Sequence, residues 1–274
     1  MKLKSKILLS LLASSSAAFA QTAPAPAAAP AAPETTIAYN VGVVSQYRYR
    51  GLAQTRGYPA LQGGVDYSNA NGVYLGAWAS TIRWIGDSST TTKSVDGKAE
   101  LDLYGGYKFE AAGITYDIGY LQYLYVGNSL SGVTTSNGAT YNLTNANTKE
   151  MYGAVTAGAY TFKYSKALSS LFGYVGSTGS TYYDLTANFD VGSGFSLSPH
   201  IGHQTVKGTS SSYYPGGLSY TDYSLTLAKD LGDGLSATFA AVSTNAKKNT
   251  NFLSNSSSYN AAKDAIVVGV KYTF

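Results

Sequence analysis

The C-terminal stretch of the chain reads DAIVVGVKYTF (264–274), and its large apolar residues fall at every second position. Ile266, Val268, Val270, Tyr272 and Phe274 share one parity, whereas Val267, Gly269, Lys271 and Thr273 share the other. A period of two is typical of a β-strand whose two faces meet different surroundings. The stretch therefore predicts a strand with one strongly apolar face.

The same period recurs along most of the chain. It is clear over 36–50, 99–109, 182–191 and 222–229, and weaker over 60–67, 73–81, 114–125, 149–158, 160–168, 195–205 and 235–243. With the last stretch, these ranges predict twelve strands. Most have a length near the roughly 9–11 residues that a tilted membrane-spanning strand needs.

The connections between these strands alternate in length. Short ones rich in Gly lie at 68–72, 110–113, 158–159, 192–194 and 231–234; long ones rich in Ser, Thr, Asn and Gly lie at 51–59, 82–98, 126–148, 169–181, 206–221 and 244–263. Strict alternation is typical of outer-membrane barrels, with short periplasmic turns and longer extracellular loops. We therefore predict an all-β fold, a transmembrane antiparallel β-barrel, over the alternative of a soluble β-sandwich.

The N-terminus predicts export. Lys2, Lys4 and Lys6 precede a short apolar run, and Ala18-Phe19-Ala20 fits a signal-peptidase site, so the mature chain is expected to begin at Gln21. We assign 1–20 to a cleaved signal peptide, 21–35 to an Ala/Pro-rich periplasmic tether and 36–274 to the barrel. The terminal pattern at Val270, Tyr272 and Phe274 resembles the signal read by the barrel-assembly machinery. These features predict the cell outer membrane of a Gram-negative bacterium.

Composition narrows the function. Charged residues are only 12%, Cys is absent, and Tyr and Gly number 25 and 30. Thiolate metal sites and disulfides are therefore excluded, and without a basic run no nucleic-acid partner is expected. Tyr suits a membrane interface, because it joins an apolar ring to a hydroxyl. By parity we expect an outward aromatic girdle of Tyr39, Tyr47, Tyr49, Tyr107, Phe109, Tyr183, Tyr272 and Phe274.

A family resemblance agrees with this fold. The stretch SQYRYRGLAQTRGYPALQGGVDY (45–67), followed by GVYLGAWAS (72–80), AELDLYGGYKF (99–109) and TYDIGYLQYLY (115–125), resembles the TorF family. This is a group of uncharacterised Gram-negative outer-membrane proteins named as porins. The resemblance extends over the whole mature barrel and is strongest in residues 40–125. It implies a porin-like barrel and brings no catalytic or binding residues.

Charged residues on the second face of the strands are the candidates for function. The set is Arg48, Arg50, Glu100, Asp102, Lys108, Asp117 and Asp184. They are expected to line the lumen of a narrow pore, where Arg48 and Arg50 would meet anions and Glu100 and Asp102 would favour cations. The alternative is a set of internal ion pairs that closes the barrel, with Glu100 and Asp102 paired to Lys108 or an Arg. Twelve strands decide neither, since small barrels are filled and large ones open.

These considerations favour a channel for passive diffusion of small hydrophilic solutes, without cofactor or metal. The expected partners are the lipid bilayer, lipopolysaccharide, the barrel-assembly machinery and the solutes. A plugged structural or surface-interaction barrel is the alternative. A hydrolase at the barrel rim finds less support, because His200 and His203 have opposite parity and neither follows a nucleophile pattern. An enzyme is not expected.

Overall fold

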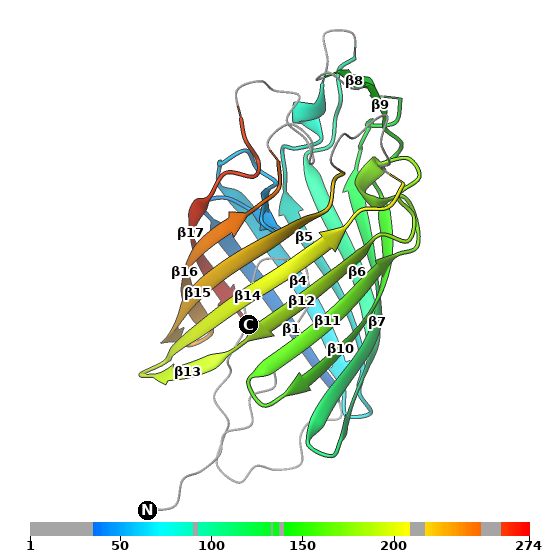
Figure 1. Cartoon of the computed structure of the whole chain (residues 1–274). Helices are drawn as coiled ribbons and strands as arrows, with labels where there is room; N and C mark the ends of the chain where they lie inside the picture. The colour runs from blue at the N-terminus through cyan, green and yellow to red at the C-terminus, as the bar shows by residue number, and fades with distance from the viewer. Residues whose placement is uncertain (1–34, 90–92, 133, 137–139, 209–216, 248–258) are drawn as a thin grey trace, which may run out of the picture.

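The chain forms one closed antiparallel β-barrel (Figure 1). The computed structural model describes residues 35–89, 93–132, 134–136, 140–208, 217–247 and 259–274. Its barrel strands are β1 (Thr35–Val44), β4 (Ala60–Asn69), β5 (Val73–Thr81), β6 (Ala99–Ala111), β7 (Ile114–Val126), β10 (Thr148–Ala157), β11 (Tyr160–Ala167), β12 (Thr181–Ala187), β14 (Phe195–Thr205), β15 (Tyr220–Gly232), β16 (Leu235–Thr244) and β17 (Ala265–Thr273). The expected signal peptide, with Ala18 and Ala20, and the tether up to residue 34 lie outside the described residues, and Thr35 already belongs to β1.

Pairing between the first and last strands closes the sheet. β1 pairs with β4 along one edge and with β17 along the other, where Val43 lies opposite Val270. On the far side β12 pairs with β14, and the short β13 (Phe189–Gly192) continues the line of β12 after a break at Asn188. Each of the twelve strands thus has a neighbour on both sides. The predicted twelve-stranded barrel is confirmed, and the predicted strands match to within a few residues except at 36–50 and 182–191.

The two ends of the barrel differ. The tight turns gather at one end, which we call the turn end, and the long connections gather at the other, which we call the loop end (Figure 1). Gly234 makes one of the turns with a φ of 81°, and a Cβ atom there would lie 2.1 Å from the carbonyl oxygen of Thr273. Only glycine fits such a close approach. β1 starts and β17 finishes at the turn end, so both termini of the barrel leave from that side.

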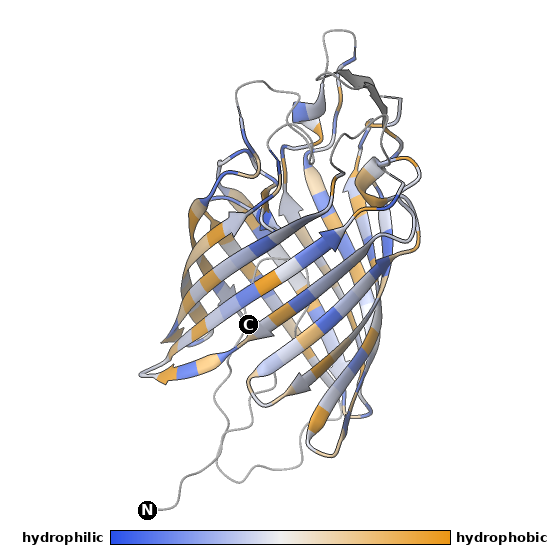
Figure 2. Ribbon diagram, viewed as in Figure 1, coloured by the Kyte–Doolittle hydropathy of each residue, from blue (hydrophilic) through white to orange (hydrophobic). Residues whose placement is uncertain are grey.

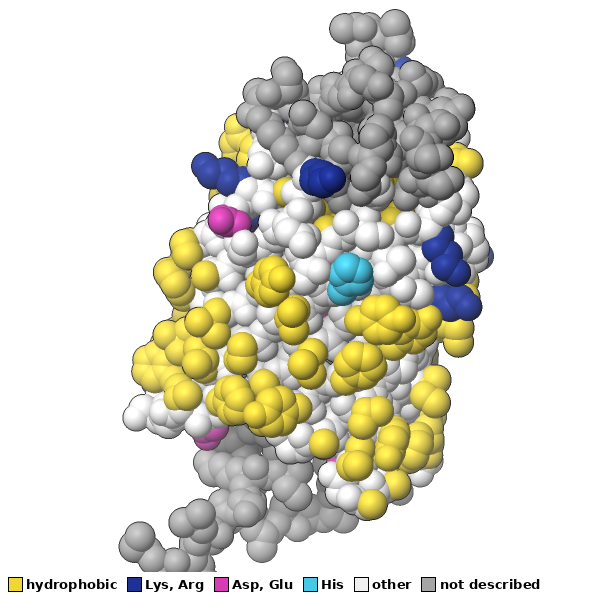
Figure 3. All heavy atoms as spheres, viewed as in Figure 1, with side chains coloured by type: hydrophobic (Ala, Val, Ile, Leu, Met, Phe, Trp, Pro, Cys, Tyr) yellow, Lys and Arg dark blue, Asp and Glu magenta, His cyan; other side chains and the backbone are white. Residues whose placement is uncertain are grey.

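The outer surface is apolar and the inner surface is polar. Residues alternate in hydropathy along the strands (Figure 2), and hydrophobic side chains form a broad belt over the strands in the space-filling view (Figure 3). Tyr272 and Phe274 stack at 5.4 Å near the turn end, and Tyr39 stacks on Phe274 at 5.8 Å. Tyr107, Phe109 and Tyr183 also face outward, as predicted. Among the described residues no helix is long and apolar enough to cross a membrane.

The first strand was predicted too long. β1 ends at Val44, and residues 45–55 turn into the barrel as a small hairpin of β2 (Arg48–Tyr49) and β3 (Leu52–Ala53), which we call the inward hairpin. Tyr47 and Tyr49 are therefore buried in the lumen, at 1% and 6% exposure, and the prediction that they belong to the outer girdle was wrong. The alternation of residues 36–50 is continuous in sequence, but the chain leaves the wall at Ser45. Beyond that residue, parity no longer tells which side chains face outward.

Tyrosine serves the lumen as well as the outer belt. Tyr74 lies across Gly106, and Tyr182 lies across Gly202, where an added Cβ would come within 2.4 Å and 1.9 Å of the phenol oxygens. Tyr104 over Gly76 and Tyr152 over Gly119 repeat the arrangement. Because an inward glycine leaves the space that a ring on a nearby strand fills, the high counts of Tyr and Gly have a shared structural cause.

The two faces of one strand should differ in how well they tolerate an added charge. Phe239→Arg, on the outer face of β16 at 50% exposure, is expected to lower the free energy of unfolding by about 2–4 kcal/mol, because an arginine there meets lipid. Thr238→Arg, on the inner face beside it, should cost much less. Equilibrium unfolding in liposomes measures both values. Equal losses would contradict this assignment of faces.

Candidate functional site

The inward hairpin is held across the lumen by Arg50. Its Nη2 lies 2.8 Å from Oε2 of Glu150 on β10, and its Nη1 donates to Oε1 of Glu150 at 3.1 Å and to Oε1 of Gln204 on β14 at 2.6 Å. The guanidinium carbon also lies 4.1 Å from the ring centroid of Tyr182 and 4.8 Å from that of Tyr49. A bidentate pair with a carboxylate is a strong charge-assisted contact, and the rings on either side add cation–π attraction. The contact ties the hairpin to β10 and β14, two wall strands that are separated by β11 and β12.

Two tyrosines of the hairpin add neutral contacts. The Tyr47 hydroxyl donates to Oε1 of Glu100 at 2.7 Å, and the Tyr49 hydroxyl lies 2.7 Å from that of Tyr123. Tyr123 in turn donates to Oε2 of Glu150 at 3.2 Å. Burial raises the pKa of the Tyr47 and Tyr49 phenols well above the usual value, so both remain neutral. The hairpin thus meets the acidic side of the lumen through hydroxyl groups and one guanidinium.

Arg48 has a different role from Arg50. Its Nη1 donates to the carbonyl oxygens of Gly51 and Ala261 at 3.0 Å and 3.1 Å, and its Nε donates to the side chain of Gln46 at 2.9 Å. Burial lowers the pKa of Arg48 from the usual value. These contacts lie within the hairpin and with the chain just before β17. In this closed arrangement Arg48 supports the shape of the hairpin, and it does not face an open channel.

Glu100 and Asp102 lie on β6 beneath the hairpin, at 1% and 0% exposure. Glu100 accepts from Tyr47, but within the described part of the chain neither carboxylate oxygen of Asp102 has a hydrogen-bond partner. Neither residue forms an ion pair among the described residues, so the predicted pairing with Lys108 or an arginine was wrong. Arg50 instead pairs with Glu150 on β10.

The next groups toward the turn end form a mixed-charge layer. Lys108 on β6 pairs with Asp117 on β7 at 3.8 Å, and the Tyr74 hydroxyl donates to the same carboxylate at 2.6 Å. Lys163 on β11 lies 3.6 Å from the ring centroid of Tyr152. The layer brings together Lys108 and Asp117, two of the predicted lumen residues, on neighbouring strands.

A second cluster surrounds His200 on the opposite wall. Its Nε2 lies 3.0 Å from Oδ1 of Asp222, and its Nδ1 lies 3.4 Å from Oδ2 of Asp184 and 3.1 Å from the hydroxyl of Thr186. Carboxylates only accept, so a carboxylate at each ring nitrogen favours the doubly protonated imidazolium. His200 then acts as a fixed positive charge between two acids. His203, on the other face of β14, is exposed, as its parity predicted.

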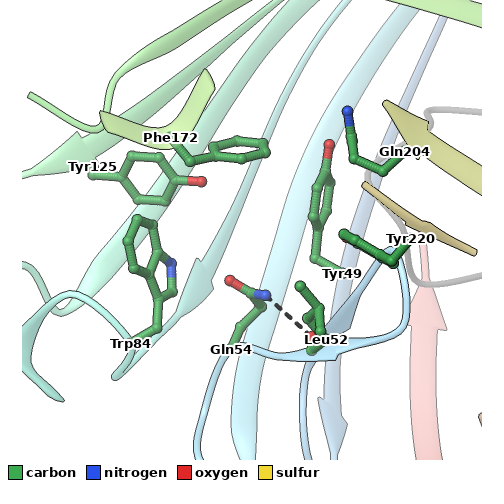
Figure 4. A pocket seen from close by; sticks show the side chains of 8 residues that line it. All are labelled: Tyr49, Leu52, Gln54, Trp84, Tyr125, Phe172, Gln204 and Tyr220. Carbon is green, nitrogen blue, oxygen red and sulfur yellow. Dashed lines mark hydrogen bonds between the residues drawn. The ribbon is translucent and has the colours of Figure 1, made fainter. Parts of the chain in front are cut away.

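The loop end holds a small aromatic pocket above the hairpin (Figure 4). Loop and strand residues line it together: Tyr49, Leu52, Gln54, Trp84, Tyr125, Phe172, Gln204 and Tyr220. The Trp84 and Tyr125 rings meet edge to face at 5.0 Å, and in the described structure the buried Trp84 Nε1 has no hydrogen-bond partner. No group of three His, Asp or Glu side chains is arranged to hold a metal ion anywhere in the described ranges.

Sequence reasoning missed the partners of the hairpin. Glu150 has inward parity on its predicted strand, but nothing near it in the sequence points to Arg50, which is separated from it by 100 positions. Gln204, the second partner of Arg50, was missed for the same reason, and so was Asp222, which contacts His200. The available signal was the run Tyr-Arg-Tyr-Arg at 47–50, in which both parities carry large polar groups. A strand end with one lipid-facing side would carry large polar groups on one parity only, so this run was a sign that the chain leaves the wall.

Comparisons with known proteins place the fold. Residues 27–274 match the model of a family described as "Bacterial protein of unknown function (Gcw_chp)", and no curated protein matches the chain. Among solved structures, the KdgM porin in complex with disordered oligogalacturonate is similar, with a TM-score of 0.50 and 8% identity over 88% of this chain and 99% of that one. The NanC porin has a TM-score of 0.49 and 11% identity, over 86% and 99%. An outer membrane channel from Pseudomonas putida F1 has 0.44 and 13%, over 88% and 94%. At these identities the likeness is one of fold.

Loss of one partner of the buried pair should release the hairpin. Glu150→Gln leaves Arg50 without its carboxylate, and we expect unfolding to become easier by about 3–5 kcal/mol, or the amides of residues 45–55 to exchange much faster. Hydrogen exchange in detergent micelles measures this. Arg56→Met removes a partly exposed pair with Asp87 and should cost less than about 1 kcal/mol. Unchanged exchange at 45–55 in Glu150→Gln would contradict the proposed anchor.

Proposed function

Because the chain belongs to the Gcw_chp family, whose description assigns no activity, we propose from its geometry that it is an outer-membrane channel for passive diffusion of small hydrophilic solutes. One observation carries the proposal: a closed barrel with an apolar outside encloses a lumen that carries charged and hydroxyl groups below the apolar packing of its loop end. A barrel that only anchored its loops has no need for such a lining. Lipid on the outside and water within explain both faces.

Two similarities support this proposal. The KdgM porin, solved with disordered oligogalacturonate, has a barrel of this kind, so such a barrel is compatible with a hydrophilic solute. The resemblance of residues 45–67 to the TorF family points the same way. In this proposal the loop end faces the outside of the cell, and lipopolysaccharide surrounds it. Residues 1–20 direct export, residues 21–35 tether the barrel in the periplasm, and Val270, Tyr272 and Phe274 are read by the barrel-assembly machinery.

The channel narrows where the inward hairpin crosses it. Solutes would pass Arg50, Glu100 and Asp102 near the loop end and then the layer of Lys108 and Asp117 and the cluster of Asp184. Positive and negative side chains occur together in each of these layers. The lining therefore favours polar solutes over apolar ones, and the net charge of each layer sets the preference for anions or cations. Passage needs movement of the hairpin, because its rings and the Arg50 pair fill the lumen.

The plugged structural barrel is a second candidate with its own observation. Arg50, Tyr47 and Tyr49 bind side chains of four strands, β6, β7, β10 and β14, and a small pocket lies above them in the described structure. If the hairpin never moves, the loops are the working surface. A rim hydrolase is not proposed, because with carboxylates at both nitrogens His200 lacks the lone pair that a general base needs to activate Thr186.

Single-channel recording separates the two candidates. We expect the refolded mature chain, residues 21–274, to give discrete current steps in a planar bilayer. A variant in which a short Gly-Ser linker replaces residues 46–54 should give larger steps, because the lumen is then clear. Steps only in the linker variant would favour the plugged barrel. A folded, heat-modifiable barrel without current in either form would overturn the channel.

A further inference from the structure

Three exposed lysines lie on the outside of the barrel at the loop end, and we call them the lysine patch. They are Lys149 on β10, Lys166 on β11 and Lys207 just after β14. In the register of β10 and β11, Glu150 lies opposite Ala167, so Lys149 is diagonally across from Lys166 on the outer face. Diagonal neighbours of an antiparallel pair lie about 7–8 Å apart. Two flexible ammonium groups at that spacing can therefore meet on one ligand.

Lys207 joins the patch from the side of β14. Its side chain lies over Gly179, where an added Cβ would come within 3.4 Å of the lysine Nζ. Its backbone N–H donates to Oγ of Ser180 at 3.0 Å. The N–H of Gly179 donates in turn to the carbonyl oxygen of Ala167 at 2.8 Å, and Ala167 directly follows Lys166. These contacts place the Lys207 side chain over the segment that pairs with the end of β11.

The lysine patch lies directly beyond the aromatic edge of the apolar belt. Along the outer face of β11, Phe162, Tyr164 and Lys166 follow one another toward the loop end. Phe162 is opposite Leu185 of β12, and the Tyr164 and Tyr183 rings lie 5.2 Å apart. In the space-filling view, the Lys and Arg side chains of the visible face lie on the loop-end side of the hydrophobic belt (Figure 3). Apolar, aromatic and basic residues in this order match hydrocarbon, membrane interface and charged headgroups.

No acidic side chain offsets the charge of the patch. The three connections next to it contain neither Asp nor Glu over 127–147, 168–180 and 206–219. Glu150, which follows Lys149 in the chain, faces inward and is bound by Arg50. Within the described residues, no ion pair includes a lysine of the patch. By contrast, Lys263 at the loop end has Asp264 beside it in the sequence. The patch therefore carries a local excess of positive charge that an anion from outside the chain can match.

We propose that the lysine patch binds the phosphate groups of lipopolysaccharide in the leaflet around the loop end. Lysine holds phosphate as a point charge, and basic residues at the edge of a membrane attract anionic lipids. The three side chains lie on the outside of the barrel, so the anion that meets them belongs to the surrounding lipid and not to a solute in the lumen. This inference rests on the outer-membrane location and orientation in the proposed function, and it is independent of conduction.

Retention of lipopolysaccharide by the captured protein tests the site. The refolded mature chain, residues 21–274, is held in neutral detergent through an affinity tag, and the lipopolysaccharide that stays bound is quantified. The double variant Lys149→Gln/Lys166→Gln should retain at least about fivefold less, because it loses two charges next to the phosphates. Lys149→Arg/Lys166→Arg keeps both charges and should retain the normal amount. Lys98→Gln/Lys263→Gln removes two exposed charges from other loop-end connections and should change nothing.

The chemistry of the lipid is tested with the same assay. Lipopolysaccharide stripped of its lipid phosphates should be retained weakly, and equally, by the unaltered chain and by Lys149→Gln/Lys166→Gln. Normal retention by that variant, or an equal loss in Lys98→Gln/Lys263→Gln, would overturn the site, with heat-modifiability showing that each variant is folded. Equal retention of phosphatidylglycerol would overturn lipopolysaccharide as the occupant. Retention without channel current would keep this inference and reject the channel, whereas current without specific retention would do the reverse.

Discussion

Closure of the sheet between β1 and β17 is the constraint on which the rest of the molecule depends. A strand in hydrocarbon has no water to satisfy its backbone groups, so every N–H and C=O must find a neighbouring strand. The pairing of β1 with both β4 and β17 removes the last free edge. Once the ring is closed, parity assigns each side chain of a wall strand to the outer or the inner face. The apolar belt and the charged lumen both follow from that one pairing.

The closed ring is too narrow to stay empty of side chains and too wide to be filled by the wall alone. The protein uses two devices to occupy the space. First, tyrosine rings lie across glycines of nearby strands, so that the inward side chains of the wall pack closely against one another. The inward hairpin then occupies the loop-end half, where charged groups from distant strands converge on it. Some charged residues of the lumen therefore hold the structure together. Arg50 pairs with Glu150 of the wall, whereas Arg48 supports the turn of the hairpin.

The sequence alone predicted the strands of the barrel wall but not the inward hairpin and its partners in the lumen, and the reason is physical. Strand parity is a local property with a period of two, so it could place Lys108 and Asp117 on one face and Tyr107 on the other. Gly-rich turns, such as the one at Gly234, can likewise be predicted from local composition. The inward hairpin keeps the same alternation after the chain has left the sheet, and Tyr47 and Tyr49 were misplaced as a result. Pairing of Arg50 with Glu150 or Gln204 depends on closure of the whole ring, which no local pattern encodes.

The hairpin also fixes an order of events during biogenesis. It is made early, from residues close to the start of the barrel, yet Arg50 binds a residue 154 positions later and Arg48 contacts one 213 positions later. Contacts at such separation form late, because the intervening chain must first be arranged. The wall therefore has to be largely assembled before the hairpin finds its place. In this order the lumen is enclosed by its wall before the inward hairpin completes its contacts with Gln204 and Ala261.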